Sequence, residues 1–458
     1  MQPGVAGEAN VADDRGLRSG VIEGFYGRPW SEGQRLALFA RMRGWRLGTY
    51  LYAPKDDLKH RLLWREPYDA AELAGLSRLV EGAHAQDVAF AYALAPGLDL
   101  RFADEEDAAA LRGKVGQVLA LGVRTVALLF DDVPRALGDA DAARFGSLAA
   151  AQADAANRLD AQLRAEGGGT LLFCPTDYCA AMARPSVAAS PYLRELGERL
   201  EPGIEVFWTG PDVVSETVDV DGVREAARTL RRKPLLWDNL HANDYDIARV
   251  NLGPYQGRPP ALRHEVAGIL ANPNGELAAD TVPLATLAAY LHDDAYEPRT
   301  AFLEAVRAWA DGFEPVGREP PSADDVAFLA DFLYLPFEHG PTARAFLDDV
   351  GTLLATPPAA WGDTFEAVAG AVARLADLAE RLSCLRDREL VVSLYPYVQD
   401  VLLEAARVAQ RLASRRAGQA PEAPRDGVAN AYGRGFADAL RRMLPEGAPG
   451  ARPRAGGR

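Results

Sequence analysis

The sequence contains very little cysteine. Its three cysteines, Cys174, Cys179 and Cys384, are spread over 458 positions and form no CxxC pair. An odd count without paired spacing supports neither a disulfide framework nor a zinc site, so we expect buried thiols in a reducing compartment and no metal. We also expect no cofactor. Neither a GxGxxG nor a GxxxxGK[ST] loop follows an apolar run, which argues against an open doubly wound sheet.

Basic charge and long apolar runs are also scarce. The 50 Lys and Arg residues are outnumbered by 65 Asp and Glu residues, and the resulting formal charge of −15 would repel a nucleic acid backbone. No run approaches the roughly 18 apolar residues that span a membrane, and the N-terminus lacks the order of a signal peptide. We therefore predict a cytoplasmic protein with neither a nucleic acid nor a membrane as a partner.

Both ends of the chain differ in composition from the rest. They are rich in Gly, Ala, Pro and charged residues, which predicts disordered tails at residues 1–17 and 446–458. The remaining chain has ordinary globular composition and should fold.

Short apolar runs alternate with longer amphipathic segments in the first part of the chain. Eight strand and helix units over about 270 residues match the size of a (β/α)₈ barrel, so we predict a TIM barrel over residues 18–296. An open, doubly wound sheet is the alternative fold. The eight predicted strands are GVIEG (20–24), LGTYLYAP (47–54), VAFAYALAP (88–96), TVALLFDDV (125–133), TLLFCPTDY (170–178), IEVFWTG (204–210), PLLWDN (234–239) and ADTVPLATL (279–287).

Helical patterns without strands follow from about residue 297, which predicts an all-α helical bundle, or stalk, over residues 297–445. Helices are expected at 363–383 and at 388–414, the second kinked or broken by Pro396. A loop at 414–427 and a last helix at 428–444 would complete this bundle.

Two adjacent aspartates, Asp131 and Asp132, end the fourth predicted strand. Two carboxylates held close together cannot both ionise freely, so the pKa of one should rise, which suits the acid and base roles of glycoside hydrolysis. The alternative is a pair that caps a helix N-terminus.

Other polar and aromatic residues follow the strands and would gather on the same face of a barrel, where TIM-barrel enzymes place their active sites. The densest cluster is WDNLHANDYD (237–246), which could instead be a structural turn or a calcium loop. Its spacing does not fit the EF-hand pattern. His241 in this cluster is expected to orient its neighbours by hydrogen bonds.

Several long sequence motifs resemble those of family 84 of the glycoside hydrolases, the β-N-acetylglucosaminidases known as protein O-GlcNAcases. They occur in the family's order through nearly the whole predicted barrel and continue into the stalk. The motifs are GVIEGFYGRPWS (20–31), TYLYAPKDDLKHRLLWREPY (49–68), ALLFDDV (127–133), FCPTDYC (173–179), GIEVFWTGP (203–211), WDNLHANDYD (237–246), LGPYQGR (252–258), ANPNGE (271–276) and LADFLYLPFEHGPTA (329–343).

This resemblance implies a retaining exo-β-N-acetylglucosaminidase that works by substrate-assisted catalysis through an oxazoline. Asp131 would orient and polarise the 2-acetamido group of the substrate. Asp132 would protonate the leaving oxygen and later deprotonate water. The implied sugar-pocket residues are Gly24, Lys55, Tyr178, Asn239, Asp244, Tyr245 and Asn272, with Trp237 as a wall.

The implied partners are a protein or glycan that carries N-acetylglucosamine and a second copy of the chain. Enzymes of the resembling family form homodimers through the stalk, and the long helix and the apolar stretch at 328–337 suit such a surface. A hyaluronidase or other glycan-chain hydrolase, and a non-catalytic N-acetylglucosamine-binding barrel, are the alternative functions.

Overall fold

The computed structural model describes residues 16–419 together with Phe436, Leu440 and Met443. The chain divides into two compact units. The first comprises the described residues up to Asp244 with Tyr255–Leu277 and Pro283–Pro298, and the second comprises Tyr245–Pro254, Ala278–Val282 and the described residues from Arg299 onward. The domain limits given above stay predictions.

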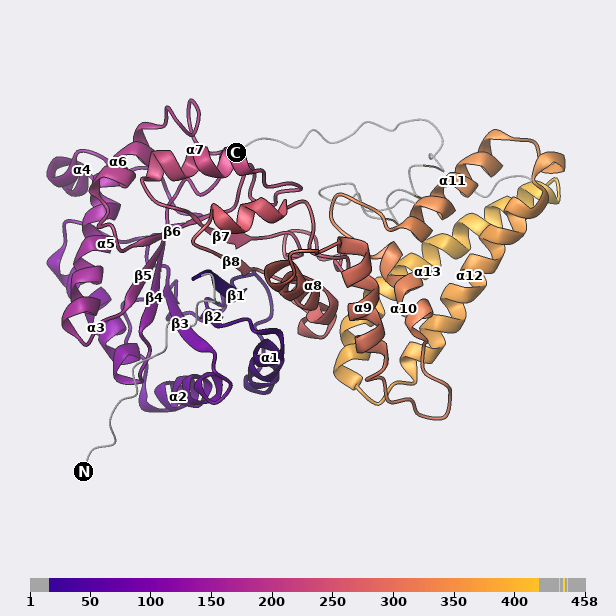
Figure 1. Ribbon diagram of the computed structural model, residues 1–458, viewed down its shortest axis with the longest axis horizontal. Helices are drawn as coiled ribbons and strands as arrows, with labels where there is room; N and C mark the ends of the chain where they lie inside the picture. The colour runs from indigo at the N-terminus through magenta and orange to yellow at the C-terminus, as the bar shows by residue number, and fades with distance from the viewer. Residues whose placement is uncertain (1–15, 420–435, 437–439, 441–442, 444–458) are drawn as a thin grey trace. The chain divides into compact units, whose positions relative to one another are not determined.

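Eight parallel strands of the first unit close into a barrel. Each strand pairs with the next in sequence and β8 pairs with β1, with helices outside the strands (Figure 1). The (β/α)₈ prediction is confirmed. The strands are β1 (Arg18–Glu23), β2 (Thr49–Tyr52), β3 (Ala89–Leu94), β4 (Thr125–Leu129), β5 (Thr170–Cys174), β6 (Glu205–Trp208), β7 (Leu235–Asp238) and β8 (Gly268–Ala271).

Helices connect these strands, each placed by an apolar stripe and a cap. In α2, Asp69 caps the first turn and Glu72 completes a capping box, while Leu76, Val80 and Ala83 are buried. The helical elements of this part are α1 (Glu32–Trp45), α2 (Ala70–His84), α3 (Glu105–Ala120), α4 (Asp139–Phe145), α5 (Leu148–Ala165), α6 (Pro191–Arg199), α7 (Val220–Leu230), η1 (Pro260–His264), η2 (Leu277–Asp280) and α8 (Thr281–His292).

The predicted eighth strand is wrong. Residues 279–287 lie in η2 and α8, whereas the last strand is the earlier run Gly268–Ala271. The apolar pattern continues to Leu291, which is too long for a strand and fits a buried helix. Pro283 is tolerated because it lies in the first turn, where its missing N–H is not needed.

The barrel interior is filled by side chains from alternating strand positions. Ile22, Leu51, Leu129, Phe207 and Leu270 belong to one buried cluster, so the barrel is a packed core rather than a channel. Ligand-handling groups are therefore expected at the ends of the strands and in the loops that follow them.

The second unit is helical, as predicted. The long helices α12 and α13 pack against each other (Figure 1), and α13 continues unbroken through Pro396. The helices of this part are α9 (Pro298–Ala310), α10 (Ala323–Phe332), α11 (Pro341–Ala355), η3 (Pro358–Ala360), α12 (Gly362–Ser383) and α13 (Arg388–Arg416).

The apolar stretch at 328–337 does not offer the partner surface expected of it. Phe328 and Phe332 are buried, and the ring of Phe332 packs edge-on against those of Phe346 and Phe436. This stretch belongs to the hydrophobic core because α10 is apolar on most of its surface.

Some predictions fall on residues that the structure does not describe. They are the N-terminal tail up to residue 15, most of the loop and last helix at 414–444, and the C-terminal tail at 446–458. Phe436, Leu440 and Met443 are helical where they are described. None of the described helices has both the length and the apolar character of a membrane span, and the cytoplasmic placement stays a prediction.

Candidate active site

Most of the predicted site residues lie at the carboxyl ends of barrel strands. Gly24 follows β1, Lys55 follows β2, Asp131 and Asp132 follow β4, and Tyr178 follows β5. Trp237 lies within β7. The others are in the loops after β7 and β8, namely Asn239, Asp244, Tyr245 and Asn272.

Asp131 forms a buried ion pair with Lys55. The Lys55 Nζ donates to Asp131 Oδ2 at 2.7 Å, and both side chains are almost fully buried. Burial acts to raise the pKa of Asp131, but the charges of Lys55 and then Arg61 outweigh it, so the pKa lies below its ordinary value. Asp131 is therefore an ionised carboxylate.

One oxygen of Asp131 is left for another group. Oδ1 is buried and has no hydrogen-bond partner within the described part of the chain. Because a buried carboxylate oxygen normally accepts a hydrogen bond, a ligand N–H or O–H could be donated to it.

Asp132 has a different environment. Its carboxylate is exposed and accepts hydrogen bonds from two tyrosine hydroxyls, Tyr178 to Oδ1 and Tyr26 to Oδ2, each at 3.1 Å. Burial, followed by the charge of Asp132, raises the pKa of Tyr178, so this hydroxyl stays a donor. The two aspartates thus differ in partners and in access to solvent.

Asn239 connects three strand ends by hydrogen bonds. Its Oδ1 accepts from Trp237 Nε1 and from Asn272 Nδ2, both at 3.0 Å, and its Nδ2 donates to the carbonyl oxygen of Val213 at 2.8 Å. Asn272 Oδ1 in turn accepts from the Gly24 N–H at 3.2 Å. Four of the predicted pocket residues are therefore connected.

Gly24 is required by the close approach of Trp237. A Cβ at this position would lie 2.4 Å from Trp237 Cζ2, well inside van der Waals contact. The indole can therefore pack directly over the end of β1 as a flat wall.

The last two predicted residues, Asp244 and Tyr245, belong to different units. Asp244 Oδ2 accepts from the Tyr26 N–H at 2.8 Å, so it supports the loop that reaches Asp132. Tyr245 is the first residue of a segment assigned to the second unit, so its place in the pocket stays a prediction.

Two residues that contact Asp132 were not predicted from the sequence. Tyr26 reaches its carboxylate from the β1 loop, and Arg61 Nη2 donates to its backbone carbonyl oxygen at 3.3 Å from the β2 loop. Both residues lie inside sequence motifs already noted, GFYGR and KHRLLW, but nothing in their spacing indicates which strand end they contact.

The arrangement suits acid and base chemistry on a neutral ligand. A buried, ionised carboxylate with a free acceptor lies next in sequence to an exposed carboxylate held by two hydroxyls, and the indole and amide groups suit a sugar. No group of three or more potential metal ligands occurs among the described residues.

The chain is similar in sequence to several known proteins. The family model described as beta-N-acetylglucosaminidase matches residues 19–321. Protein O-GlcNAcase from Rattus norvegicus is 46% identical over 285 residues, covering 62% of this chain and 31% of that protein. The Mus musculus protein of the same name is also 46% identical, over 63% of this chain and 32% of that protein. The chain thus spans about a third of these relatives' length.

A solved structure extends the similarity beyond the barrel. A mutant of the O-GlcNAc hydrolase from Thermobaculum terrenum superposes with a TM-score of 0.76 and 31% identity, covering 87% of this chain and 84% of that chain. These comparisons confirm the family resemblance that the sequence motifs indicated. The chain belongs to the beta-N-acetylglucosaminidase family.

Proposed function

We propose that the chain is a retaining exo-β-N-acetylglucosaminidase that removes β-linked N-acetylglucosamine from Ser and Thr of proteins or from related glycoconjugates. The observation that carries this proposal is the unlike pair at the end of β4, with Asp131 buried against Lys55 and Asp132 exposed between two tyrosines. The names of the relatives and the family description support it.

In the proposed first step, the substrate supplies its own nucleophile. The carbonyl oxygen of the 2-acetamido group attacks C1, the bond from C1 to the leaving oxygen breaks, and Asp132 gives that oxygen a proton. Asp131 accepts the acetamido N–H on its open Oδ1 and stabilises the positive oxazolinium. Intramolecular attack avoids the entropy loss of bringing two molecules together.

The second step reverses the roles. Water attacks C1, Asp132 takes its proton, and the C1 bond to the acetamido oxygen breaks, which restores the amide with retained configuration. One carboxyl group therefore acts as acid and then as base, while the other stays ionised.

The sugar would be held by the surrounding residues at the strand ends. We propose Trp237 as a wall under the ring, and amide, ammonium, hydroxyl and carboxylate groups as hydrogen-bond partners. These partners are Gly24, Lys55, Tyr178, Asn239, Asp244, Tyr245 and Asn272.

Turnover of aryl β-N-acetylglucosaminides tests the proposal. We expect Asp131→Asn and Asp132→Asn each to lower turnover by about 10²- to 10⁴-fold, since each removes one charge-handling group. Asp132→Asn should lose far less on substrates with good leaving groups, which need little protonation. Near-normal turnover by both variants would contradict the assignment, as would absence of turnover by the wild type.

Two further parts of the proposal concern partners. A hyaluronidase-like hydrolase is the nearer alternative function, and comparing glycopeptides with long glycosaminoglycans as substrates distinguishes the two functions.

We also propose a homodimer formed through the helical region. The exposed apolar side chains of α13 support this proposal.

A further inference from the structure

The loop between β2 and α2 supplies a contact to each aspartate. Lys55, at its start, binds the carboxylate of Asp131. Arg61, six residues later, is buried, and its Nη2 donates to the backbone carbonyl oxygen of Asp132 at 3.3 Å. The same loop therefore holds one aspartate by its side chain and the next by its main chain.

The backbone of Asp132 is in an uncommon conformation. Its φ is +52°, in the left-handed region, which Asp tolerates better than most residues with a side chain but which is still less favourable for it than a negative φ. Relaxation to an ordinary φ would move the peptide and the side chain together, because both are attached to one Cα. The carboxylate would then leave the hydroxyls of Tyr26 and Tyr178. A bond that fixes the carbonyl therefore fixes the carboxylate as well.

The position of Arg61 is poorly explained by stability alone. Its Nη1 is buried and has no hydrogen-bond partner among the described residues, and a buried donor without a partner is unfavourable. A buried polar group without a partner therefore needs an explanation other than stability.

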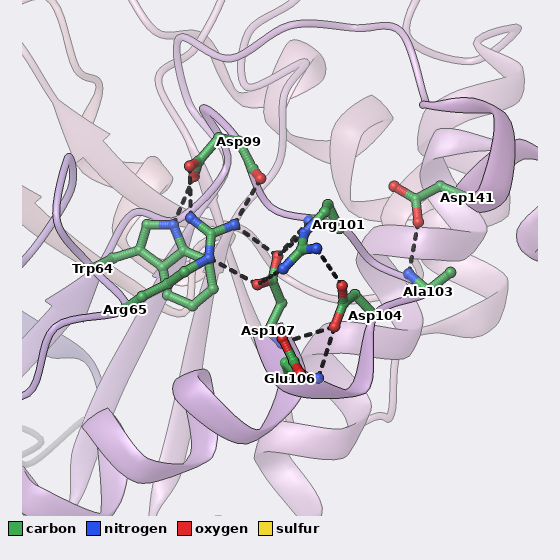
Figure 2. A network of polar contacts seen from close by, with 9 residues as sticks. All are labelled: Trp64, Arg65, Asp99, Arg101, Ala103, Asp104, Glu106, Asp107 and Asp141. Atoms are coloured by element: carbon green, nitrogen blue, oxygen red, sulfur yellow. Dashed lines mark hydrogen bonds and ion pairs between the residues drawn. The ribbon is translucent and has the colours of Figure 1, made fainter.

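The loop is also anchored just beyond Arg61, as Figure 2 shows. Trp64 Nε1 donates to Asp99 Oδ1 at 2.8 Å, and Arg65 Nη1 donates to Asp99 Oδ2 at 2.6 Å. Arg65 makes two more bonds to Asp107 at the start of α3, each at 2.7 Å, and Arg101 binds the same carboxylate. This anchor leaves Arg61 little freedom to move away from Asp132.

We propose that Arg61 is a positioning residue that keeps Asp132 in its left-handed conformation through the backbone carbonyl. This inference rests on the proposed function, since it assumes that Asp132 is the acid and base. In this role Arg61 acts on the main chain of Asp132 and not on its carboxylate.

The test is the dependence of kcat on the leaving group in Arg61→Met. A misplaced acid harms substrates that need protonation, so kcat for an alkyl or methoxyphenyl N-acetylglucosaminide should fall at least about tenfold more than kcat for the dinitrophenyl substrate. In the Asp132→Asn background, Arg61→Met should cause little further loss. Arg78→Met, which removes a surface pair with Glu32, should leave both substrates unaffected.

Each outcome decides one question. If the wild type hydrolyses neither substrate, the proposed function fails. If the wild type hydrolyses both and Arg61→Met loses the same factor on both, the positioning role is overturned. Should thermal melting show that Arg61→Met does not fold, Arg61→Gln decides, because the amide of glutamine ends two bonds short of the Nη2 that makes this bond. An unchanged leaving-group ratio in Arg61→Gln then overturns the role.

Discussion

At the scale of single residues, the Lys55 and Asp131 pair sets the charge state of the site. Burial raises the pKa of Asp131 and lowers that of Lys55, and their mutual attraction more than compensates for both effects. Neither charge is then stable in this environment without the other.

This coupling predicts a pH effect. In Lys55→Met, burial of Asp131 is no longer offset by the ammonium, so the pKa of Asp131 should rise. Asp131 must be ionised for the proposed reaction, so the acidic limb of kcat/KM should move to higher pH, with a loss of activity at neutral pH. A pH profile of kcat/KM measures the shift.

Lys59→Met is the matched control for this prediction. Lys59 lies on the same loop and pairs with Glu72 at 2.6 Å, away from the aspartates. Its removal should leave the acidic limb in place. An unmoved limb in Lys55→Met would show that Lys55 does not govern the charge of Asp131.

The sequence revealed the two aspartates but not all their contacts. The pair is visible because both charges directly follow an apolar strand. Tyr26 and Arg61 lie 106 and 71 residues from Asp132, and such distant contacts depend on how loops from different strands converge. Only the fold supplies that information, since the residue types alone suit many other roles.

At the scale of elements, strands surrounded on both faces were the easiest to predict. Six of the eight runs contain an observed strand and a seventh, 20–24, overlaps one, because buried parallel strands are almost continuously apolar. The eighth was misassigned because β8 has only four residues, whereas α8 is apolar nearly all round and imitates a strand in a short window.

The start of α10 offers a prediction about acid stability. Asp325 caps this helix with Ser322 and accepts hydrogen bonds from Arg374, while Arg381 of α12 forms an ion pair with it at 2.8 Å. Burial raises its pKa, but the bonds from Ser322, Arg374 and Arg381 lower it to about 2, from a model-compound value of 3.8. Asp325 thus links two helices only while it is ionised.

A pKa that is lower in the folded state stabilises the protein above the unfolded value and loses that effect as pH falls. Asp325 should therefore contribute at most about 2 kcal/mol above pH ~4, and this contribution should disappear between pH ~4 and ~2. In urea unfolding, Asp325→Asn should be less stable than the wild type at pH 7, and the gap should narrow near pH 2.5. The exposed neighbour Asp324→Asn should change little at either pH. A gap of the same size at both pH values would contradict this account.

At the scale of the whole molecule, the change from alternating strands and helices to helices alone was visible in the sequence. The two kinds of chain bury their apolar residues with different periods, which distinguishes a barrel from a bundle without any tertiary information. Which helical surfaces stay exposed was less visible. The most apolar stretch, at 328–337, is buried, whereas α13 exposes three large apolar side chains.

These side chains, Val392, Tyr395 and Leu403, are 69%, 54% and 65% exposed. Their spacing of three and eight residues places them on one side of the helix. An apolar stripe on a helix surface is typical of a protein interface, and Tyr is enriched at such contacts. A second copy of the chain is the partner that the proposed homodimer would bring to this stripe.

Light scattering at micromolar concentration tests this last prediction. We expect the wild type to have twice the chain mass of 49.3 kDa and the double variant Val392→Asp/Leu403→Asp to have the mass of one chain, because the added charges would be buried without partners. Thermal melting should show that the double variant still folds, since both side chains are exposed in the single chain. Leu303→Asp, on the exposed side of α9, is the matched control and should stay dimeric. A wild type with the mass of one chain would rule out the dimer, and a double variant that stays dimeric would place the interface elsewhere than on α13.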